Sequence, residues 1–497
     1  MENIPSVNGI ELGAADWSGT PLSVQQLVLS LWSENQALKK RLSLVEEQIK
    51  QNSQNSSRPP SGDGFGQKKV EKNIGEKRTR GGQQGHRGHE PHLYAESVCR
   101  EIHDHLPSTC KACGVELSGI DEHPYRHQSV EIPPIVPEII EHRLHQLMCP
   151  HCGISTRAPL PAHISHRTYG ERLCACIAWL SSDYRQSHGQ LKQLLARLFG
   201  IEISRASINR VRQQMSDALA PILSEAHTYI QSQPLMHSDE TSFAQGNGDG
   251  QNPKLTKGWL WVLVTQSVTV FEVALSRGQV MAQTMIGAHY DGIVISDRYS
   301  SYAWLDAKQR QVCWAHLKRD FTAMAERTGV SQEIGQALLE RQKRLFRWWH
   351  RVRDGTMGRD QFQRAVAVLR QAFTVELEIA AALTVAPKEK SPLAKTVRTC
   401  RQILKLESAL WTFVDVPGVE PTNNAAEQAL RPAVIWRRTS FGSQSQGGSQ
   451  FVARMLSVVT SLKAQNRDVW DFLTLVVRAH RLDLPMPSLI PLKNLSP

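Results

Sequence analysis

The sequence predicts a multidomain α+β protein, in which an N-terminal coiled-coil helix and a metal-binding ribbon precede a helical region and an α/β core with a helical insertion. Three observations support this prediction: a heptad repeat of apolar residues at 22–50, two Cys-x-x-Cys pairs between residues 110 and 152, and a series of apolar strand-like runs that starts near residue 235. At 497 residues the chain is also longer than one hydrophobic core usually supports, about 250–300 residues, so several domains are expected.

Residues 22–50 are expected to form one helix with an apolar stripe. A single polar residue at an a position of the heptad, here Asn35, is a known means of fixing the register and dimeric state of a coiled coil. We therefore expect the helix to pair with a second copy of itself. The alternative is an amphipathic helix that packs on its own domain. The a positions hold Val28, Asn35, Leu42 and Ile49, and the d positions hold Leu31, Leu38 and Val45.

From residue 51 to about 91 the chain is polar, glycine-rich and basic, so it has too few apolar residues for a core and is expected to be a flexible linker. The whole chain has a net charge of +11, which suits a polyanionic partner. The linker could follow a phosphate backbone without sequence preference, or it could serve only as a soluble connection. Its basic residues are Lys68, Lys69, Lys72, Lys77, Arg78, Arg80 and Arg87.

The strongest local motif is a pair of Cys-x-x-Cys sequences, Cys110 with Cys113 and Cys149 with Cys152. Two such pairs supply four thiolates, the ligand set of a tetrahedral Zn²⁺ site. Residues 130–147 between the pairs are expected to form two strands that close a ribbon. A site with four Cys ligands has no open position, so we expect one structural zinc ion here, with unligated thiols as the alternative.

The other cysteines are scattered, and Cys174 and Cys176 lie in an apolar helix-like run where they are expected to be core residues. This pattern does not suggest a disulfide framework and is typical of a reduced, intracellular protein. The N-terminus lacks the features of a signal peptide, and no apolar stretch approaches the length of a membrane span, about 20 residues. We therefore expect a cytoplasmic protein without a membrane partner.

Residues 188–218 are expected to form a helix-turn-helix, with Gly200 ending the first helix and Ser204 capping the second. The second helix of such a motif enters the major groove of DNA. A helical hairpin with a solvated basic face is the alternative. The residues that could face a groove or phosphates are Arg205, Asn209, Arg210, Arg212 and Gln213.

Three short segments each place one acidic residue where it suits a metal ligand. Asp239 and Asp297 end apolar runs that are typical of buried strands, and Glu427 lies on the first turn of an expected helix. Carboxylates arranged in this way hold two hard divalent cations, Mg²⁺ or Mn²⁺, about 4 Å apart, which together act on a phosphodiester. The segments are HSDET at 237–241, SDRYSSY at 296–302 and TNNAAEQALRP at 422–432.

Each acidic residue also has a structural alternative. Asp239 could end a strand in a turn, and Asp297 could cap the turn that follows it. Glu427 fits a capping box in which Asn424 is the N-cap. Arg431 lies four residues after Glu427, so it could meet a phosphate beside the metal ions or form an ion pair with Glu427 on the same helix. Two further candidates for DNA contact on this helix are Arg437 and Arg438.

The acidic segments lie within a regular succession of elements. The expected strands are 235–244, 257–265, 267–275 and 292–297, with a helix at 278–287 and a further strand and helix around CWAHLKRDF at 313–321. Residues of about 330–415 are expected to form a helical insertion with an apolar face made by Ile334, Leu338, Leu345, Trp349 and Val352. Residues 450–483 are expected to form two closing helices.

Taken together, these segments resemble the transposase family of insertion sequence 66. The resemblance covers most of the chain: NSSRPPSGDG at 55–64, GGQQGHRGH at 81–89, the paired cysteines, YRQ at 184–186, the CWAH block at 313–316 and the three acidic segments occur in the family's order. One departure is Arg298, which stands where Gly is common in the family. Since the carboxylates themselves are intact, this departure bears on rate and not on chemistry.

The resemblance implies a ribonuclease-H-like core of the DDE type, in which Asp239 and Asp297 lie on neighbouring strands and Glu427 arrives on a late helix. It also implies a DNA transposase that uses two Mg²⁺ or Mn²⁺ ions to cleave transposon ends and join them to target DNA. Accessory proteins of the same element are implied as partners. A DNA-binding repressor with an inactive core and a metal-dependent nuclease without joining activity are the alternatives.

The expected division of the chain follows from these motifs. It comprises a coiled-coil oligomerisation helix (22–50), a basic flexible linker (51–95), a zinc-binding ribbon (96–165), a helix-turn-helix-like DNA-binding region (166–230), the catalytic core with its insertion (231–463), and a C-terminal helix and tail (464–497).

Overall fold

The structure, a computed structural model, describes residues 6–7, 10–11, 17–50, 56 and 93–491. The chain divides into two compact units. One comprises residues 1–69, 144–191 and 204–497, and the other comprises residues 70–143 and 192–203. Nearly all of the expected basic linker lies outside the described residues.

The N-terminal part contains the helix that the heptad pattern predicts. Helix α2 spans Leu22–Lys50, the range expected from the sequence. Three of its heptad residues, Leu31, Leu38 and Leu42, are 56%, 60% and 60% exposed, so the apolar stripe faces solvent in the isolated chain. Pairing with a second copy stays a prediction. Before this helix, β1 (Ser6–Val7) pairs with β2 (Ile10–Glu11).

The cysteine-rich segment differs from expectation between residues 130 and 147. Two strands were expected in this fully described stretch, but it holds only the start of one short hairpin. Strand β3 (Gln146–Met148) pairs antiparallel with β4 (Ser155–Arg157), across the second cysteine pair. The prediction of two strands is therefore wrong, because the apolar residues of 130–140, such as Ile132 and Ile139, remain exposed and pair with nothing in the ladder. The short helix η2 (Glu96–Val98) lies earlier in this segment.

The core contains a five-stranded mixed sheet with the order β7-β6-β5-β8-β9. Strands β7, β6 and β5 form an antiparallel meander, and β5, β8 and β9 run parallel. This confirms the expected succession of strands and the expected neighbourhood of the first and fourth strands. The bounds are β5 Leu235–Ser242, β6 Trp259–Val264, β7 Thr269–Ala274, β8 Ile293–Ser296 and β9 Arg310–Val312, with α6 (Gln279–Ile286) between β7 and β8.

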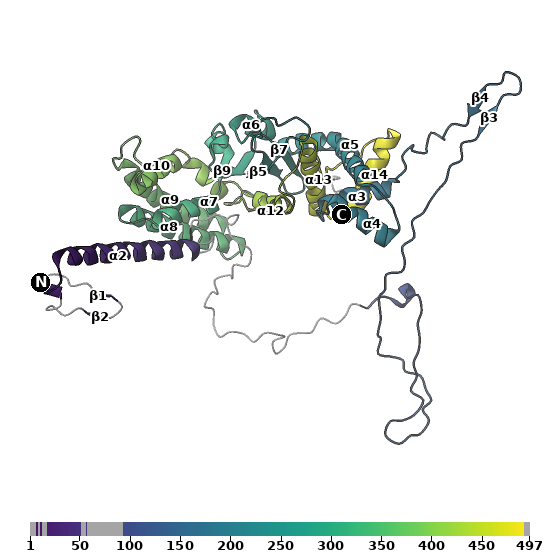
Figure 1. Cartoon of the computed structure of the whole chain (residues 1–497), viewed down its shortest axis with the longest axis horizontal. Helices are drawn as coiled ribbons and strands as arrows, with labels where there is room; N and C mark the ends of the chain where they lie inside the picture. The colour runs from purple at the N-terminus through teal and green to yellow at the C-terminus, as the bar shows by residue number, and fades with distance from the viewer. Residues whose placement is uncertain (1–5, 8–9, 12–16, 51–55, 57–92, 492–497) are drawn as a thin grey trace. The chain divides into compact units, whose positions relative to one another are not determined.

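Helix α13 (Gln446–Ala464) closes the antiparallel edge of the sheet. The backbone N–H groups of Thr269 and Phe271 on edge strand β7 donate to the hydroxyls of Ser461 (2.9 Å) and Ser457 (2.8 Å) on that helix. Backbone groups on an open edge would otherwise be free to pair with another chain. Helix α12 (Asn424–Ser440) contacts β5 and β6 near the centre of the sheet (Figure 1).

Helices that are far apart in sequence form one layer beside the sheet. Helix α3 (Glu171–Ser182) packs on α14 (Val469–Leu482), and α5 (Arg205–Gln231) packs on α3, α13 and α14. An ion pair of 3.0 Å joins Arg172 to Asp471, and Trp179 stacks on Trp470. Cys174 and Cys176 are buried here, as expected. Between α3 and α5 lies α4 (His188–Phe199).

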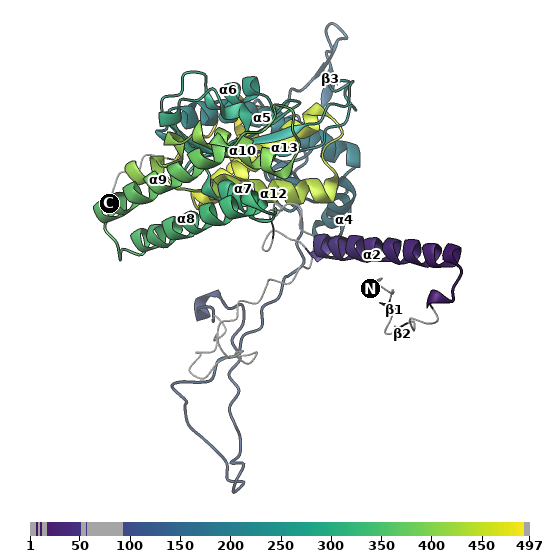
Figure 2. The same cartoon turned by 90° about the vertical axis from the view of Figure 1, so that its left-hand side faces the viewer.

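The expected helical insertion is present between α7 (Trp314–Ala325) and α12. Helices α8 (Val330–Arg353) and α9 (Arg359–Ala382) lie side by side (Figure 2), and α10 (Pro392–Leu404), η5 (Ser408–Leu410) and α11 (Thr412–Asp415) follow. The expected apolar face is confirmed, since Leu338, Leu345 and Trp349 are buried. None of the described helices is long and apolar enough to span a bilayer.

Candidate active site

The carboxyl ends of the three parallel strands carry a row of polar side chains. Pairing of β5 with β8 matches residues that differ by 58 in number, from Leu235 with Ile293 onwards, and Asp239 and Asp297 differ by the same number. Neighbouring strands in a sheet lie about 4.8 Å apart, so the two aspartates lie side by side at the level where β8 ends, although β5 itself continues to Ser242.

The row continues onto the third parallel strand. Pairing of β8 with β9 matches residues that differ by 16, and Asp297 and Cys313 keep that difference. The N–H of Cys313 donates to the carbonyl of Ser296 over 2.9 Å, which extends the ladder to this point. Asp239, Asp297 and Cys313 therefore lie in one row across β5, β8 and β9.

Glu427 reaches this edge from the first turn of α12, and Asn423 fixes where that helix begins. The Asn423 side chain is fully buried, donates to the carbonyl of Ser238 (2.8 Å) and lies 3.0 Å from Nδ1 of His237. Its carbonyl accepts the N–H of Glu427 over 3.1 Å. The alternative capping box with Asn424 as N-cap is wrong, because the N-cap is Asn423 and its side chain bonds to β5 instead of capping the helix.

The three carboxylates are close enough to influence one another. Burial raises the pKa of Asp239 well above its usual range, and the negative charges of Glu240, Asp297 and Glu427 raise it further. The side chain of Asp239 accepts the N–H of Glu240 (2.9 Å), and that of Asp297 accepts the N–H of Tyr299 (2.9 Å). Asp297 therefore caps the turn that follows it and also belongs to the row of carboxylates.

A buried network supports β5 from the side opposite Asp239. Glu240 follows Asp239 in a strand, so its side chain points to the other face. It receives a hydrogen bond of 2.5 Å from the hydroxyl of Tyr302 and an ion pair of 2.8 Å from Arg277. Burial raises the pKa of Glu240, the charge of Asp297 adds to this, and Tyr302 and Arg277 oppose it. Arg277 in turn lies over the ring of Tyr299, 3.6 Å from its centroid.

Two arginines hold the loop that carries Asp297. Arg310 is buried on β9 and donates to the carbonyl of Asp297 over 2.6 Å. Arg298, the residue that departs from the family pattern, makes two hydrogen bonds to Asp320 of α7 (2.7 and 3.0 Å) and one to Gln402 of α10 (3.0 Å). Arg298 thus links the loop after β8 to the helical insertion, a contact that Gly could not make.

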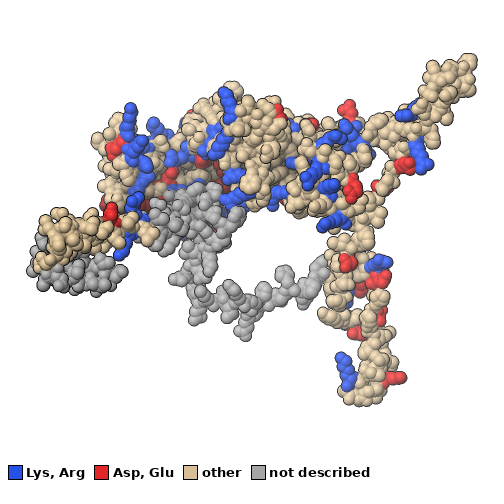
Figure 3. All heavy atoms as spheres, in the orientation of Figure 1, with Lys and Arg blue, Asp and Glu red and all other residues tan. Residues whose placement is uncertain are grey.

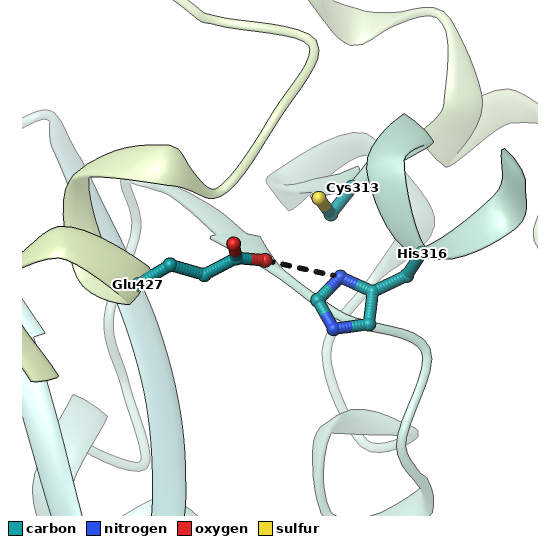
Figure 4. A group of neighbouring side chains, drawn as sticks. All are labelled: Cys313, His316 and Glu427. Atoms are coloured by element: carbon teal, nitrogen blue, oxygen red, sulfur yellow. Dashed lines mark ion pairs between the residues drawn. The ribbon is translucent and has the colours of Figure 1, made fainter. Parts of the chain in front are cut away.

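His316 and Cys313 face Glu427 from the start of α7 (Figure 4). Nδ1 of His316 lies 3.7 Å from a carboxylate oxygen of Glu427. The donor atoms of Cys313, His316 and Glu427 all lie within 4.8 Å of one another, so the three side chains form a group that could hold a metal ion. Burial raises the pKa of the Cys313 thiol to about 11.

The two Cys-x-x-Cys sequences adopt the same local structure. In each, the N–H of a following glycine, Gly114 or Gly153, donates to the carbonyl of the first cysteine over 2.9 Å, and each glycine has a positive φ of about 70°. Hydrogen bonds from backbone N–H groups lower the pKa of Cys110 and of Cys149. The largest contribution comes from the N–H of Ala112 for Cys110 and from that of Cys152 for Cys149. Both turns therefore favour thiolates, the form that binds zinc. The pairs belong to different units, so each is described by itself.

The expected second helix of the helix-turn-helix is α5, and Ser204 is its N-cap, accepting the N–H of Ser207. Arg205, Asn209 and Arg210 are exposed on it, as a contact surface requires. Arg212 is different: it is largely buried over the ring of Phe451, hydrogen-bonds to His188, and burial lowers its pKa to about 10. The expectation that Arg212 faces a groove is therefore wrong.

The basic residues of α12 fall into separate environments. Arg431 is exposed, and Glu427 lies near His316, so the alternative ion pair between Glu427 and Arg431 is not formed among the described residues. One nitrogen of Arg437 donates to the hydroxyls of Thr241 and Ser242 (2.8 Å each), at the end of β5. Arg438 is exposed. Figure 3 shows many further Lys and Arg side chains over the face of the α3–α14 part seen there.

Several residues of the site have no role in the sequence prediction. Alternation along β5 could have placed Glu240 opposite Asp239, but not next to Tyr302 or Arg277, which are distant in sequence. His316 lies in the CWAH block and was visible as part of a motif. Asn423 could not have been distinguished from Asn424, because only the fold shows which of the two faces β5.

Comparison with protein families identifies the chain. Residues 166–451 match the family described as "Transposase IS66 family", which is more than half of the chain. Residues 107–153, which include both cysteine pairs, match the "zinc-finger binding domain of transposase IS66". The class that fold and site define is thus a mixed α+β protein with an acidic site and a zinc-finger domain. The chain belongs to the IS66 transposase family.

Three further matches carry no described activity. Residues 20–92 match a "Family of unknown function (DUF6444)". The chain is 26% identical over 417 residues to "Uncharacterized protein y4qI" of Sinorhizobium fredii, covering 78% of this chain and 73% of that protein. It is 26% identical over 395 residues to "Uncharacterized protein y4hP" of the same organism, covering 73% and 68%.

Proposed function

We propose that this protein is a DNA transposase that cleaves the ends of its element and joins them to target DNA, with Asp239, Asp297 and Glu427 as the catalytic carboxylates. One observation carries the proposal: Asp239 and Asp297 share the register of two parallel strands, and Asn423 holds the first turn of α12, which carries Glu427, against β5. The strand order supports a ribonuclease-H-like core of the DDE type.

The three carboxylates suit a pair of hard divalent cations, Mg²⁺ or Mn²⁺. These ions prefer oxygen ligands. Burial and then the neighbouring negative charges raise the pKa of Asp239, and a bound cation would relieve the repulsion among these charges. The chemistry that such ions would supply when bound is activation of an attacking water and stabilisation of the leaving 3′ oxygen. The protein's own residues set the geometry: Asn423 holds the start of α12 against β5, and Arg310 holds the backbone of Asp297.

A structural Zn²⁺ is proposed for Cys110, Cys113, Cys149 and Cys152. Backbone N–H groups in both turns favour the thiolate, and four thiolates complete a tetrahedral site without an open position. This ion would stabilise the ribbon at 96–165 and take no part in DNA cleavage.

We propose double-stranded DNA as the substrate and a homodimer or higher oligomer as the working form. Arg205, Asn209 and Arg210 on α5 are exposed candidates for contacts with bases or phosphates, and Arg431 and Arg438 for contacts near the carboxylates. The exposed leucines of α2 supply a surface for self-association. The domain division given above, and accessory proteins of the same element as partners, remain part of this proposal.

The test is a cleavage and joining assay on labelled DNA that carries the inverted repeats flanking the gene, with Mg²⁺ present. Wild type, Asp239→Ala and the matched control Asp291→Asn are compared; Asp291 is an exposed aspartate before β8. We expect cleaved and joined products from the wild type and from Asp291→Asn, and none from Asp239→Ala.

Other outcomes point to the alternative functions. Cleavage without joined products favours a nuclease. Binding of the repeats without either product favours a repressor with an inactive core. Retention of both products by Asp239→Ala would contradict the assignment of the first carboxylate.

A further inference from the structure

A second metal-binding arrangement lies beside the proposed catalytic carboxylates. Cys313 is the N-cap of α7 and His316 lies in its first turn, so a Cys-x-x-His sequence presents sulfur and nitrogen from one helix end. Glu427 faces them from α12, and the donor atoms of the three lie within 4.8 Å of one another (Figure 4). Among the described residues, none of these three side chains forms an ion pair outside the group.

The local contacts prepare this group for a cation. Nδ1 of His316 is buried and has no hydrogen-bond partner, although buried polar atoms in proteins nearly always have one. The N–H of Asn423 donates to Sγ of Cys313 over 3.1 Å. Burial outweighs this bond and raises the pKa of the thiol to about 11, so a bound cation would have to displace the thiol proton. Glu427 is 39% exposed, which leaves access from solvent.

We propose that Cys313, His316 and Glu427 form a binding site for one transition-metal ion of the Zn²⁺ class. Sulfur, nitrogen and oxygen ligands together select Zn²⁺ over Mg²⁺, which prefers oxygen alone. Three protein ligands leave a fourth position open, unlike the four-cysteine site. The inference rests on the proposed function in one respect: Glu427 is shared, so Zn²⁺ bound here removes a ligand from the Mg²⁺ pair and inhibits cleavage.

The experiment measures metal binding directly on the full-length protein. Protein is treated with a mild chelator, its residual zinc is determined by mass spectrometry, and Co²⁺ is then added as a spectroscopic probe. We expect wild type to take up one equivalent beyond the four-cysteine site, with a sulfur-to-cobalt charge-transfer band. Cys313→Ser and His316→Ala should each weaken this uptake by about 100-fold or more. Loss of a residue that only hydrogen-bonds to a metal ligand already lowers metal affinity by about 10–100-fold, and loss of a ligand should cost at least as much.

Matched controls separate ligand loss from misfolding. Cys400→Ser removes another buried cysteine and His350→Ala another histidine, and both should keep the additional equivalent. Asp239→Asn should also keep it, although it should abolish Mg²⁺-dependent cleavage. Absence of the additional equivalent from wild type, or its survival in both Cys313→Ser and His316→Ala, would overturn the inference.

The two proposals fail in distinguishable ways. If wild type cleaves DNA with Mg²⁺ but takes up no additional Co²⁺, the metal site is refuted and the transposase proposal stands. If the additional Co²⁺ binds and no cleavage occurs, the catalytic proposal is the one in difficulty. A loss of cleavage on Zn²⁺ addition that His316→Ala relieves supports both.

Discussion

Asp239 of β5 and Asp297, which directly follows β8, keep the same register across two adjacent parallel strands, although 57 residues separate them in the chain. The relationship depends on the sheet order, in which β8 returns through α6 to lie beside β5 and not beside β7. Two carboxylates placed in this way repel each other, and Glu427 adds a third charge. A protein without a use for this arrangement would be more stable without it.

We expect Asp297→Asn and Glu427→Gln each to lower Mg²⁺-dependent cleavage by about 100-fold or more, because each removes an anionic oxygen from a site whose catalysis depends on bound cations. Binding to the inverted repeats should change little. Gel-shift and cleavage assays on the same preparations measure both properties. Glu420→Gln is a suitable control, since Glu420 is exposed shortly before α12. Equal cleavage by Glu427→Gln and wild type would remove Glu427 from the site.

Asp239→Asn should stabilise the folded protein in the absence of divalent cations. The pKa of Asp239 is raised in the fold by burial and by its acidic neighbours, so its ionised form costs stability once the pH exceeds the unfolded pKa, about 4. The gain should therefore be absent at lower pH and largest at neutral pH. An increase of about 1 kcal/mol in the free energy of unfolding would raise the Tm of a domain of about 150–250 residues by about 2–4 °C.

Thermal unfolding with and without Mg²⁺ tests this expectation. Added Mg²⁺ should raise the Tm of wild type more than that of Asp239→Asn, because a ligand stabilises the state that binds it. A lower Tm for Asp239→Asn than for wild type in metal-free buffer at neutral pH would show that the ionised carboxylate of Asp239 does not destabilise the fold.

The sequence was sufficient for the elements that depend on local pattern. Apolar runs located the strands within a few residues, the heptad repeat gave the bounds of α2, and Ser204 was correctly expected to cap α5. These features depend on residues close together in the chain, so a single sequence contains them.

Features that depend on the tertiary fold were not accessible in the same way. Arg212 and Arg205 are both basic residues of α5, and only the packing of α13 on α5 decides that Arg212 is buried against Phe451. The expected strands at 130–147 did not form, because apolar residues are not enough where no neighbouring strand exists to pair with them.

The network behind Asp239 should contribute to stability through Glu240. Arg277→Met leaves a buried carboxylate without its ion pair, and such losses cost about 3–5 kcal/mol. Because Arg277 is partly exposed and Tyr302 still donates to Glu240, we expect the lower end of this range. Glu240→Gln together with Arg277→Met should recover part of the loss, since the uncompensated charge is gone. Chemical denaturation of the two single variants and the double variant measures the coupling; additive losses would show that Glu240 and Arg277 act independently.

Removal of zinc should affect the ribbon and leave the core folded. Cys149→Ser deletes one of four proposed ligands, so we expect the purified variant to contain one zinc equivalent fewer than wild type. Cys99→Ser, which changes a half-buried cysteine of the same segment outside the two pairs, should keep the wild-type zinc content. The main thermal transition, which reports on the sheet and its helices, should be unchanged in both variants, whereas limited proteolysis should cut the region of 96–165 faster in Cys149→Ser. Equal zinc content in wild type and Cys149→Ser would show that the second cysteine pair does not bind the metal.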